Sequence, residues 1–342
     1  MNNQSNAATA AQAPSLVKVD AASTFSEVFS PGETAIKVFN QRSERCIDAN
    51  TKFVPNESLV RMFLGWQQAP KQPLCFGLHG HTGTGKTEFL LWVADRMNIP
   101  VYLVQCQPTL MPEDLEGFNQ LKNGCTSFEL GAALQAYRDG GLLILDELDK
   151  LNEASGAYLH GLLEGKPITV AQTGETITKH PHCWIAATGN TKGQGGDEDY
   201  TSSQQMDMAL RSRIGWLQVD YPEPATEMSI LDKHFGKLLP KKMLREVIKV
   251  ANDLRDAKFG KDRKGTDTPV GVICSTRSLV NWMFYTIRFG KKQQWRASFN
   301  YALGGSIDPE SEAEVQAIVQ RRLGEALDVK VEDVIKAFSI KK

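Results

Sequence analysis

The segment Gly80-His-Thr-Gly-Thr-Gly-Lys-Thr87 constrains the fold of this chain more than any other feature. It matches the pattern GxxxxGK followed by Ser or Thr, and it lies between an apolar run at Leu74–His79 and an amphipathic helical pattern. Glycines let successive backbone N–H groups turn inward around an anion, and the start of a helix adds partial positive charge. A chance match in a glycine-rich turn is the alternative, and the flanking strand and helix argue against it. The segment therefore predicts a phosphate-binding loop.

Each position of this loop has an expected role. The nest of backbone donors comprises Gly80, His81, Thr82, Gly83, Thr84 and Gly85. Lys86 is expected to contact the β- and γ-phosphates of a nucleotide, and the Thr87 hydroxyl to ligate Mg²⁺. The Asn-Lys-x-Asp element that reads a guanine base is absent, because Asn190-Thr-Lys192-Gly193 lacks the acid. ATP is therefore favoured over GTP.

Short apolar runs alternate with longer amphipathic stretches between residues 74 and 222. Strands that are apolar on both sides and joined by helices predict an α/β fold, a three-layer core around a parallel sheet. The expected strands are Leu74–His79, Val101–Gln105, Leu142–Leu145, Cys183–Thr188 and Trp216–Tyr221. Val101–Gln105 lies in the sequence between Leu74–His79, which precedes the phosphate loop, and Leu142–Leu145. Nucleotide hydrolases with an extra central strand have this order.

Composition divides the rest of the chain. Residues 1–23 are expected to be a flexible leader, because they are rich in Ala, Gln and Asn. Residues 24–73 form an N-terminal extension with a helix near Leu59–Trp66, and residues 74–222 form the α/β nucleotide-binding domain. Residues 223–342 are predicted to be an all-helical lid domain. Its expected features are apolar stripes over 243–254 and 280–287, a solvated basic loop at 258–264, and last helices near 311–323 and 331–338.

A pair of acids ends the expected strand Leu142–Leu145. A bound Mg-nucleotide needs a carboxylate at the tip of a neighbouring strand, and Asp146 can supply it as the second metal ligand. Glu147 follows directly and can orient and polarise an attacking water. A cap on the following helix is the alternative role for Glu147, and that role is compatible with catalysis. The pair predicts hydrolysis of the nucleotide rather than binding alone.

Four further residues are candidates for the same site. Asn190 follows the strand Cys183–Thr188, so it should emerge at the same carboxyl edge of the sheet, where it can position the water. Arg211 and Arg213 precede the last strand, and an arginine beside a γ-phosphate stabilises charge during transfer, even when a neighbouring subunit supplies it. Surface ion pairing is equally open for both arginines. Arg277 opens the second apolar helix of the lid, from which it can reach back to the nucleotide.

Charge and composition exclude several classes of protein. The net charge of −1, from 39 basic and 40 acidic residues, creates no strong field for nucleic acid or anionic lipid. No apolar run approaches the roughly 20 residues that span a bilayer, and the start lacks the parts of a secretory signal. The six cysteines are scattered, and His180-Pro-His182 has no further ligand nearby. We therefore expect a cytoplasmic protein with reduced thiols, no membrane partner and no nucleic-acid partner.

With these residues assembled, the chain resembles the MoxR branch of the AAA+ ATPases. Besides the loop and the acid pair, the resemblance rests on Arg211-Ser-Arg213, on Ser275-Thr-Arg277 and on two expected hairpins, Phe118–Leu130 and Ile168–Thr178. Within the branch the chain is most similar to the small ATPase subunit of aerobic cobaltochelatase. The similar segments are Phe25-Ser-Glu-Val-Phe29, Leu163-Glu-Gly-Lys166, His180-Pro-His182, Gly189-Asn-Thr-Lys-Gly193-Gln-Gly195 and Gln204-Gln-Met206.

The resemblance implies an ATPase ring, usually hexameric, with Asn190 as sensor one and Arg277 as sensor two. It implies that Arg211 or Arg213 acts in trans; the branch commonly has Asp-Arg-Phe where this chain has Ser212-Arg213-Ile214, so both arginines stay candidates. It also implies a partner with a von Willebrand A domain, which the ring remodels or activates, and the two hairpins are candidates for the surface that faces the partner or the pore.

Two functions of other classes remain as alternatives. One is a nucleotide-switched assembly scaffold with little turnover. The other is the ATPase of a nucleic-acid-linked mobile-element or restriction system, and the balanced charge of the chain argues against it. The chain contains no motif that would by itself bind a tetrapyrrole or cobalt.

Overall fold

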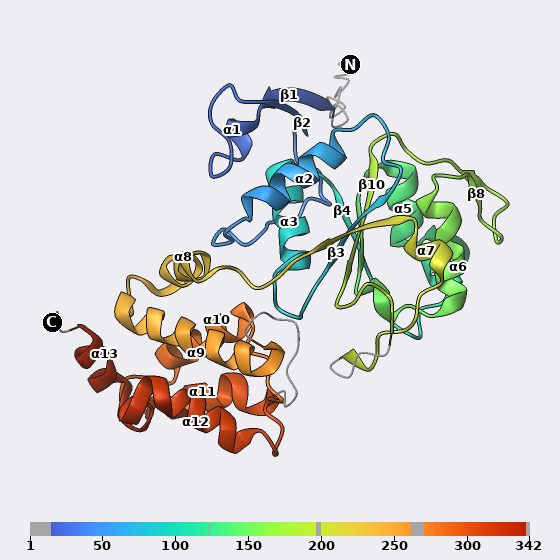
Figure 1. Ribbon diagram of the computed structural model, residues 1–342. Helices are drawn as coiled ribbons and strands as arrows, with labels where there is room; N and C mark the ends of the chain where they lie inside the picture. Colours follow the sequence, from blue (N-terminus) through green and yellow to red (C-terminus); the bar gives the residue numbers. More distant parts are fainter. Residues whose placement is uncertain (1–14, 123, 196–199, 261–269, 340–342) are drawn as a thin grey trace, which may run out of the picture. The chain divides into compact units, whose positions relative to one another are not determined.

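The computed structural model describes residues 15–122, 124–195, 200–260 and 270–339 (Figure 1). The chain divides into two compact units. The first comprises the described residues up to Asn50 together with Pro55–His79 and Thr87–Leu217. The second comprises Thr51–Val54, Gly80–Lys86 and the described residues from Gln218 onward, so the expected phosphate loop groups with the helical part of the chain.

A five-stranded sheet forms the centre of the first unit, in the order β11-β3-β10-β7-β4. The strands are β3 (Cys75–His79), β4 (Val101–Gln105), β7 (Gly141–Asp146), β10 (Cys183–Gly189) and β11 (Ile214–Gln218). Strands β3, β10, β7 and β4 pair in parallel, and every residue of β3 and β10 is buried. β10 therefore lies between β3, which leads into the phosphate loop, and β7, which ends at the acids. β4 lies at an edge of the sheet.

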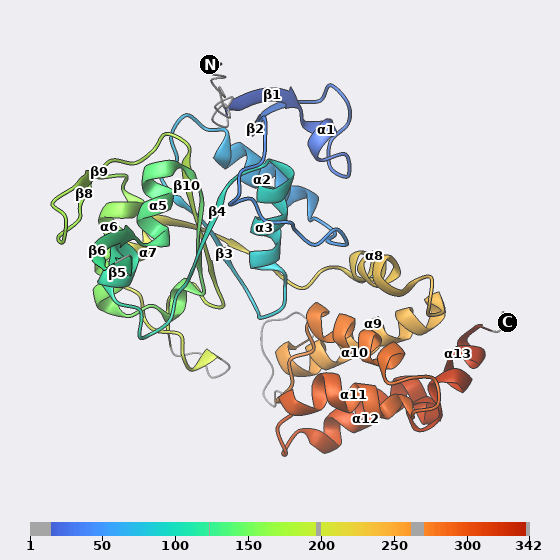
Figure 2. The ribbon, with the colours of Figure 1, turned by 180° about the vertical axis from the view of Figure 1, so that it is seen from behind.

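Helices cover both faces of this sheet, which confirms the three-layer α/β fold (Figures 1 and 2). On one face lie α2 (Glu57–Gln67) and α3 (Lys86–Arg96), and on the other lie α5 (Ala132–Asp139) and α6 (Glu153–Leu163). Aromatic packing fixes the first layer, since the Phe63 ring of α2 lies 5.2 Å from that of Phe76 in β3. The second layer buries Leu134, Tyr137, Leu159 and Leu162 against the strands.

The expected flexible leader is wrong for its last residues. Leu16–Asp20 forms strand β1, which pairs antiparallel with β2 (Ala35–Phe39), and α1 (Ala21–Thr24) follows. The Asp20 side chain accepts a hydrogen bond from the Ala22 amide at 3.0 Å and so caps that helix. Alternation of apolar and charged residues over Val17–Asp20 is a strand pattern that the polar composition around it obscures.

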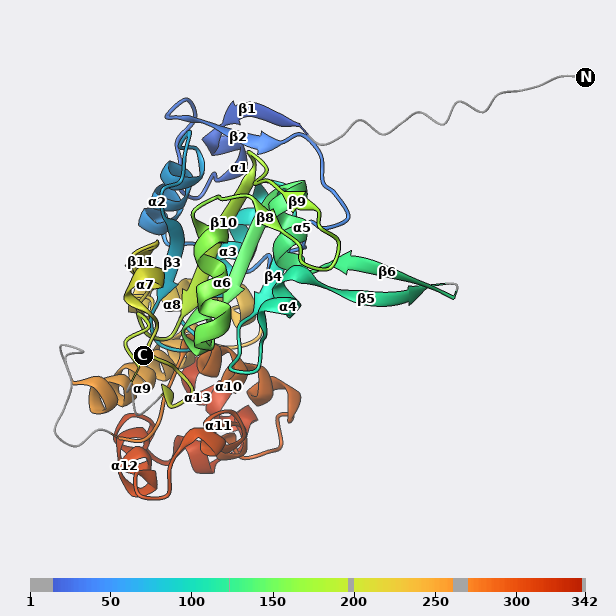
Figure 3. The same ribbon diagram turned by 90° about the vertical axis from the view of Figure 1, so that its right-hand side faces the viewer.

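Both expected hairpins are confirmed. β5 (Gly117–Lys122) pairs with β6 (Cys125–Leu130) after the short helix α4 (Pro112–Glu116), and β8 (Ile168–Thr169) pairs with β9 (Thr176–Ile177). Asn123 in the first turn lies outside the described residues. Figure 3 shows the β5–β6 hairpin extending away from the sheet.

The second unit is helical, as expected. Its helices are α8 (Pro224–Phe235), α9 (Lys241–Phe259), α10 (Thr276–Arg288), α11 (Trp295–Leu303), α12 (Glu312–Leu323) and α13 (Val331–Ser339). Phe284 was expected in the buried apolar stripe over 280–287, and this is wrong: it is 41% exposed, and the buried face of α10 runs through Leu279, Trp282, Met283 and Thr286. The expected basic loop begins inside α9, and residues 261–264 of it lie outside the described residues. No helix in the described ranges has the length and hydropathy to cross a membrane.

Candidate active site

The phosphate loop, Gly80–Lys86, joins β3 to α3, and its glycines Gly80, Gly83 and Gly85 all have a positive φ. At Gly80 (φ 147°) a Cβ would lie 2.1 Å from the Val219 carbonyl oxygen, and at Gly83 (φ 73°) 2.6 Å from the Ser275 side chain. The Lys86 ammonium folds back over the loop and donates to the carbonyl oxygens of Gly80 at 2.6 Å and His81 at 2.9 Å. The backbone conformation and the inward lysine fit a phosphate-binding loop.

Aromatic packing fixes the loop within the second unit. The His81 ring stacks on Phe259 with centroids 4.1 Å apart and on Tyr221 at 6.0 Å. The Tyr221 hydroxyl donates to the Thr82 carbonyl oxygen at 3.2 Å, and Thr84 Oγ1 donates to the His81 carbonyl oxygen at 3.0 Å. The sequence pattern did not reveal these aromatic contacts, since Tyr221 and Phe259 lie far from the loop in the chain.

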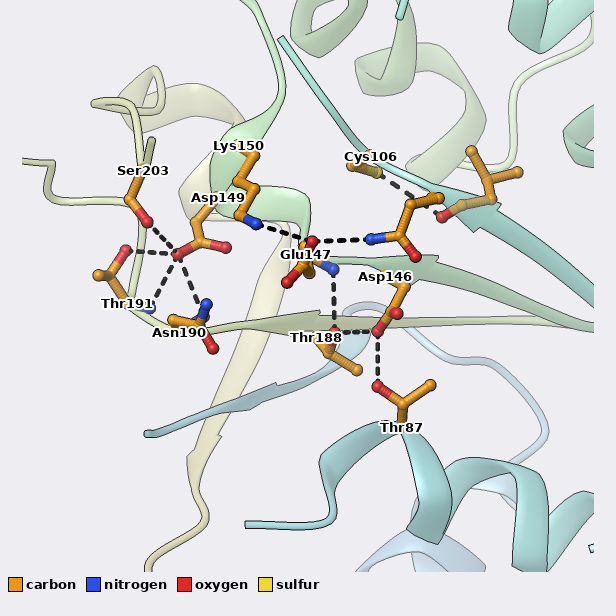
Figure 4. Close-up of polar contacts among 12 residues, drawn as sticks. Thr87, Cys106, Asp146, Glu147, Asp149, Lys150, Thr188, Asn190, Thr191 and Ser203 are labelled. Atoms are coloured by element: carbon orange, nitrogen blue, oxygen red, sulfur yellow. Dashed lines mark hydrogen bonds and ion pairs between the residues drawn. The ribbon is translucent and has the colours of Figure 1, made fainter. Parts of the chain in front are cut away.

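Asp146 ends strand β7 and accepts two hydrogen bonds on one oxygen (Figure 4). The hydroxyls of Thr87 and Thr188 each donate to Asp146 Oδ1 at 2.6 Å. A carboxylate beside a hydroxyl is the oxygen-donor set that suits Mg²⁺, so the residues present fit the expected ion. Thr188 is a site residue that the sequence analysis missed; its place at the end of the strand before Asn190 was the available signal.

Glu147 is held by three contacts in the left-handed backbone region, with φ 55° and ψ 43°. Its Oε2 accepts hydrogen bonds from Gln105 Nε2 at 2.8 Å and Lys150 Nζ at 2.9 Å, while its amide donates to Thr188 Oγ1 at 3.0 Å. A side chain other than glycine rarely takes this conformation, and such outliers concentrate at functional sites. The Glu147 side chain remains 36% exposed and thus open to water.

Asn190 lies where the strand order predicted. It follows β10, the neighbour of β7, and its amide donates to Asp149 Oδ2 at 3.1 Å. Asn190, Asp146 and Glu147 therefore share one carboxyl edge of the sheet. Asp149 is a second residue that the sequence analysis missed; its place two residues after Glu147, in the 3₁₀ helix Leu148–Lys150, was the available signal.

The structure separates the two arginines before β11. Arg213 donates from Nε to Glu164 Oε1 at 2.8 Å and also contacts the Ala209 carbonyl oxygen. Hydrogen bonds from Lys166 and then Arg213 lower the pKa of Glu164 to about 2. Arg211 ends α7 (Met208–Arg211), and among the described residues its guanidinium has no hydrogen-bond or ion-pair partner.

Arg277 is the second residue of α10 and is exposed. A Cβ built on Gly83 would lie 3.5 Å from the Arg277 Cβ, so the start of α10 packs directly on the phosphate loop. The capping Ser275, whose side chain accepts from the Ser278 amide at 3.1 Å, fixes that helix start. This placement supports the expectation that Arg277 can reach a nucleotide.

Comparison with known proteins gives consistent matches. Residues 76–214 match the AAA domain of the dynein-related subfamily. The chain is 31% identical over 229 residues to the protein NorQ of Paracoccus denitrificans, covering 67% of this chain and 78% of NorQ. It is 29% identical over 167 residues to the denitrification regulatory protein NirQ of Stutzerimonas stutzeri, covering 48% of this chain and 58% of NirQ.

Among solved structures, RuvB of Thermotoga maritima matches with a TM-score of 0.45 and 16% identity, covering 82% of this chain and 73% of RuvB. The family is shown by the sequence relatives, together with the phosphate loop and the acid pair, and not by RuvB. This chain belongs to the MoxR branch of the AAA+ ATPases and is an ATP hydrolase.

Proposed function

We propose that this ATPase uses Mg-ATP in a ring to remodel or activate a partner protein complex. The observation that carries the proposal is the cluster at the carboxyl edge of β7 and β10, where Thr87 and Thr188 converge on Asp146 and Glu147 is held beside them. A protein that only bound nucleotide would not need the second acid. Steady-state phosphate release by the purified chain tests the ATP hydrolysis on which this proposal depends, and binding of ATP without turnover would instead favour a nucleotide-switched scaffold.

The chemistry follows from the donors present. The glycine loop and Lys86 would hold the β- and γ-phosphates, and Thr87 and Asp146 would hold Mg²⁺, which would neutralise charge on the phosphate oxygens. Asn190 orients a water, and Glu147 accepts its proton as the water oxygen bonds to the γ-phosphorus. The bond from that phosphorus to the bridging oxygen breaks, which leaves ADP and phosphate, and the proton passes from Glu147 to solvent.

We assign the role in trans to Arg211. Arg213 is bound to Glu164 within its own chain, whereas Arg211 has no such partner among the described residues. Because an arginine supplied to a γ-phosphate contributes about 10³-fold or more to the rate, Arg211→Ala should lose nearly all hydrolysis. Arg213→Ala should keep most of it.

Mixing Arg211→Ala subunits with Glu147→Gln subunits distinguishes a role of Arg211 in trans from misfolding of the Arg211→Ala variant. Arg211→Ala subunits retain Glu147, and Glu147→Gln subunits retain Arg211, so mixed rings contain some complete sites. We expect phosphate release from the mixture to exceed that of either variant alone by several-fold. A mixture that stays as inactive as its parts, or an Arg213→Ala variant as inactive as Arg211→Ala, would contradict the assignment.

The β5–β6 hairpin is our candidate for the surface that faces the partner. Phe118 is 58% exposed and Leu121 is 72% exposed, on a hairpin that extends from the sheet (Figure 3). Isolated exposed side chains of this size are ordinary, but two on one projecting hairpin can anchor a protein partner. The partner expected from the resemblance carries a von Willebrand A domain, and a cytoplasmic location and a hexameric ring belong to the same proposal.

Substitution of the hairpin should uncouple the partner from the ATPase. Phe118→Ser with Leu121→Ser should leave the basal rate within twofold, because both side chains lie away from the acids, and should lower affinity for the von Willebrand A partner by roughly tenfold or more. Titration of the partner against immobilised ATPase measures it. Equal affinity of the variant would show that the hairpin is a structural insertion only.

A further inference from the structure

Asp149 is fully buried and gathers four donors on one oxygen (Figure 4). It lies in the 3₁₀ helix η1 (Leu148–Lys150), which starts directly after Glu147. Its Oδ2 accepts hydrogen bonds from the backbone amides of Asn190 and Thr191 at 3.1 and 2.9 Å. It also accepts from Thr191 Oγ1 at 3.0 Å and from Ser203 Oγ at 2.7 Å.

These contacts join two arms of the chain, Asn190–Gly195 and Tyr200–Met206. Asp149 binds the first arm at Asn190 and the second at Ser203, and its own carbonyl oxygen accepts from the Gln204 amide at 2.7 Å. The arms also bind each other, because the Met206 amide donates to the Gly193 carbonyl oxygen at 3.0 Å. The second arm leads directly into α7, which ends at Arg211.

We infer that Asp149 is a positioning residue for ATP hydrolysis, whose buried carboxylate sets the place of Asn190 relative to Glu147. The inference rests on the role proposed for Asn190. Glu147 is the N-cap of η1, and Asp149 is the second residue of that helix. The acid that accepts the proton and the carboxylate that binds the Asn190 amide are therefore only two residues apart in the chain. Displacement of reacting groups by about 1 Å costs roughly 100-fold in rate.

The choice of acceptor supports this role over simple packing. Four donors converge on Oδ2, and an apolar residue would leave them buried and unsatisfied. Among the described residues, Oδ1 has no hydrogen-bond partner. All the donors of the two arms that reach the side chain of Asp149 therefore bind one oxygen, Oδ2. Asparagine has the same shape and keeps one acceptor oxygen, but it carries no charge, which weakens each of the four hydrogen bonds.

A double-mutant cycle tests the inference. Asp149→Asn should lower kcat for ATP hydrolysis by roughly 10- to 100-fold. It should leave the affinity for Mg-ATP unchanged, because the phosphate loop is not touched. Asn190→Ala should lower kcat by a similar factor. If Asp149 acts through Asn190, the double variant should be no slower than the Asn190→Ala variant. The inference would be overturned if kcat of the double variant fell by the product of the two single-variant factors, or if kcat of Asp149→Asn were unchanged.

A second series guards against a fold defect in Asp149→Asn. Ser203→Ala removes one donor without touching the carboxylate, and we expect a severalfold drop in kcat that disappears in the Asn190→Ala background. Ser26→Ala, on an exposed serine of the N-terminal extension, is the matched control and should keep the wild-type rate. A drop in Ser203→Ala that persists in the Asn190→Ala background would overturn the inference as well.

The same measurements separate failure of this inference from failure of the proposed function. If Asn190→Ala hydrolyses ATP at the wild-type rate, the role proposed for Asn190 is wrong, and the inference falls with it. If Asn190→Ala is slow and Asp149→Asn is folded and fast, the proposed function stands and only the role of Asp149 is wrong.

Discussion

Glu147→Gln is expected to bind Mg-ATP as tightly as the wild-type protein and to hydrolyse it about 100-fold more slowly, or slower still. The amide has nearly the shape of the carboxylate, so Asp146 and its two hydroxyl donors at 2.6 Å are undisturbed. An amide cannot accept the proton of the attacking water, and this loss should appear in kcat alone. Titration with a fluorescent ATP analogue and phosphate release measure the two quantities.

Lys86→Ala is the matched control because it should fail at the opposite step. Lys86 is 8% exposed, and its ammonium lies over the loop carbonyls, where it is placed to meet the phosphates. Its removal should weaken Mg-ATP binding, whereas Glu147→Gln should not. Undiminished turnover in Glu147→Gln would refute the assignment of the water-activating acid, and unchanged ATP affinity in Lys86→Ala would refute the nucleotide site itself.

The parts of this site that the sequence predicted are those fixed by local spacing. The loop Gly80–Lys86 and the acids Asp146 and Glu147 each lie on contiguous residues beside an apolar strand, so motif and strand pattern identify them together. Asn190 was also predictable, since parallel strands bring their carboxyl ends to one edge. The strand pattern placed β4 correctly in the chain and could not show that β10 separates β3 from β7.

The contacts that hold these residues were not predictable, because they join positions far apart in the chain. Thr188 binds Asp146 from 42 residues away, and Ser203 binds Asp149 from 54 residues away. Such serines, threonines and aspartates are common in any loop, so no local pattern distinguishes them. The same holds for Tyr221, whose hydroxyl binds the Thr82 carbonyl oxygen 139 residues away.

A buried ion pair supports the phosphate loop from the helical unit. Arg255 and Glu227 both have fully buried side chains and are joined by hydrogen bonds of 2.7 and 3.0 Å. Arg255 also donates to the Cys274 carbonyl oxygen at 2.7 Å, and Thr276 Oγ1 donates to Glu227 at 2.7 Å. The pair therefore ties α8 and α9 to the start of α10, next to Arg277.

Arg255→Met is expected to destabilise the protein by about 3–5 kcal/mol, because it leaves the Glu227 carboxylate buried without its cation. The double variant Arg255→Met with Glu227→Met should be less destabilised than the single one, since it removes both charges. Urea unfolding followed by circular dichroism measures the change. A loss below about 1 kcal/mol in Arg255→Met would contradict the role assigned to the pair.

The exposed pair on the same unit provides the control and links stability to function. Arg322 binds Asp253 with 41% and 23% of the side chains exposed, so Arg322→Ala should cost less than about 1 kcal/mol.

Arg255 also lies 4.3 Å over the Tyr221 ring, on which His81 of the phosphate loop stacks. Folded Arg255→Met should therefore bind Mg-ATP several-fold more weakly, and Arg322→Ala should bind it normally. Unchanged ATP affinity in Arg255→Met would show that the loop keeps its conformation without this support.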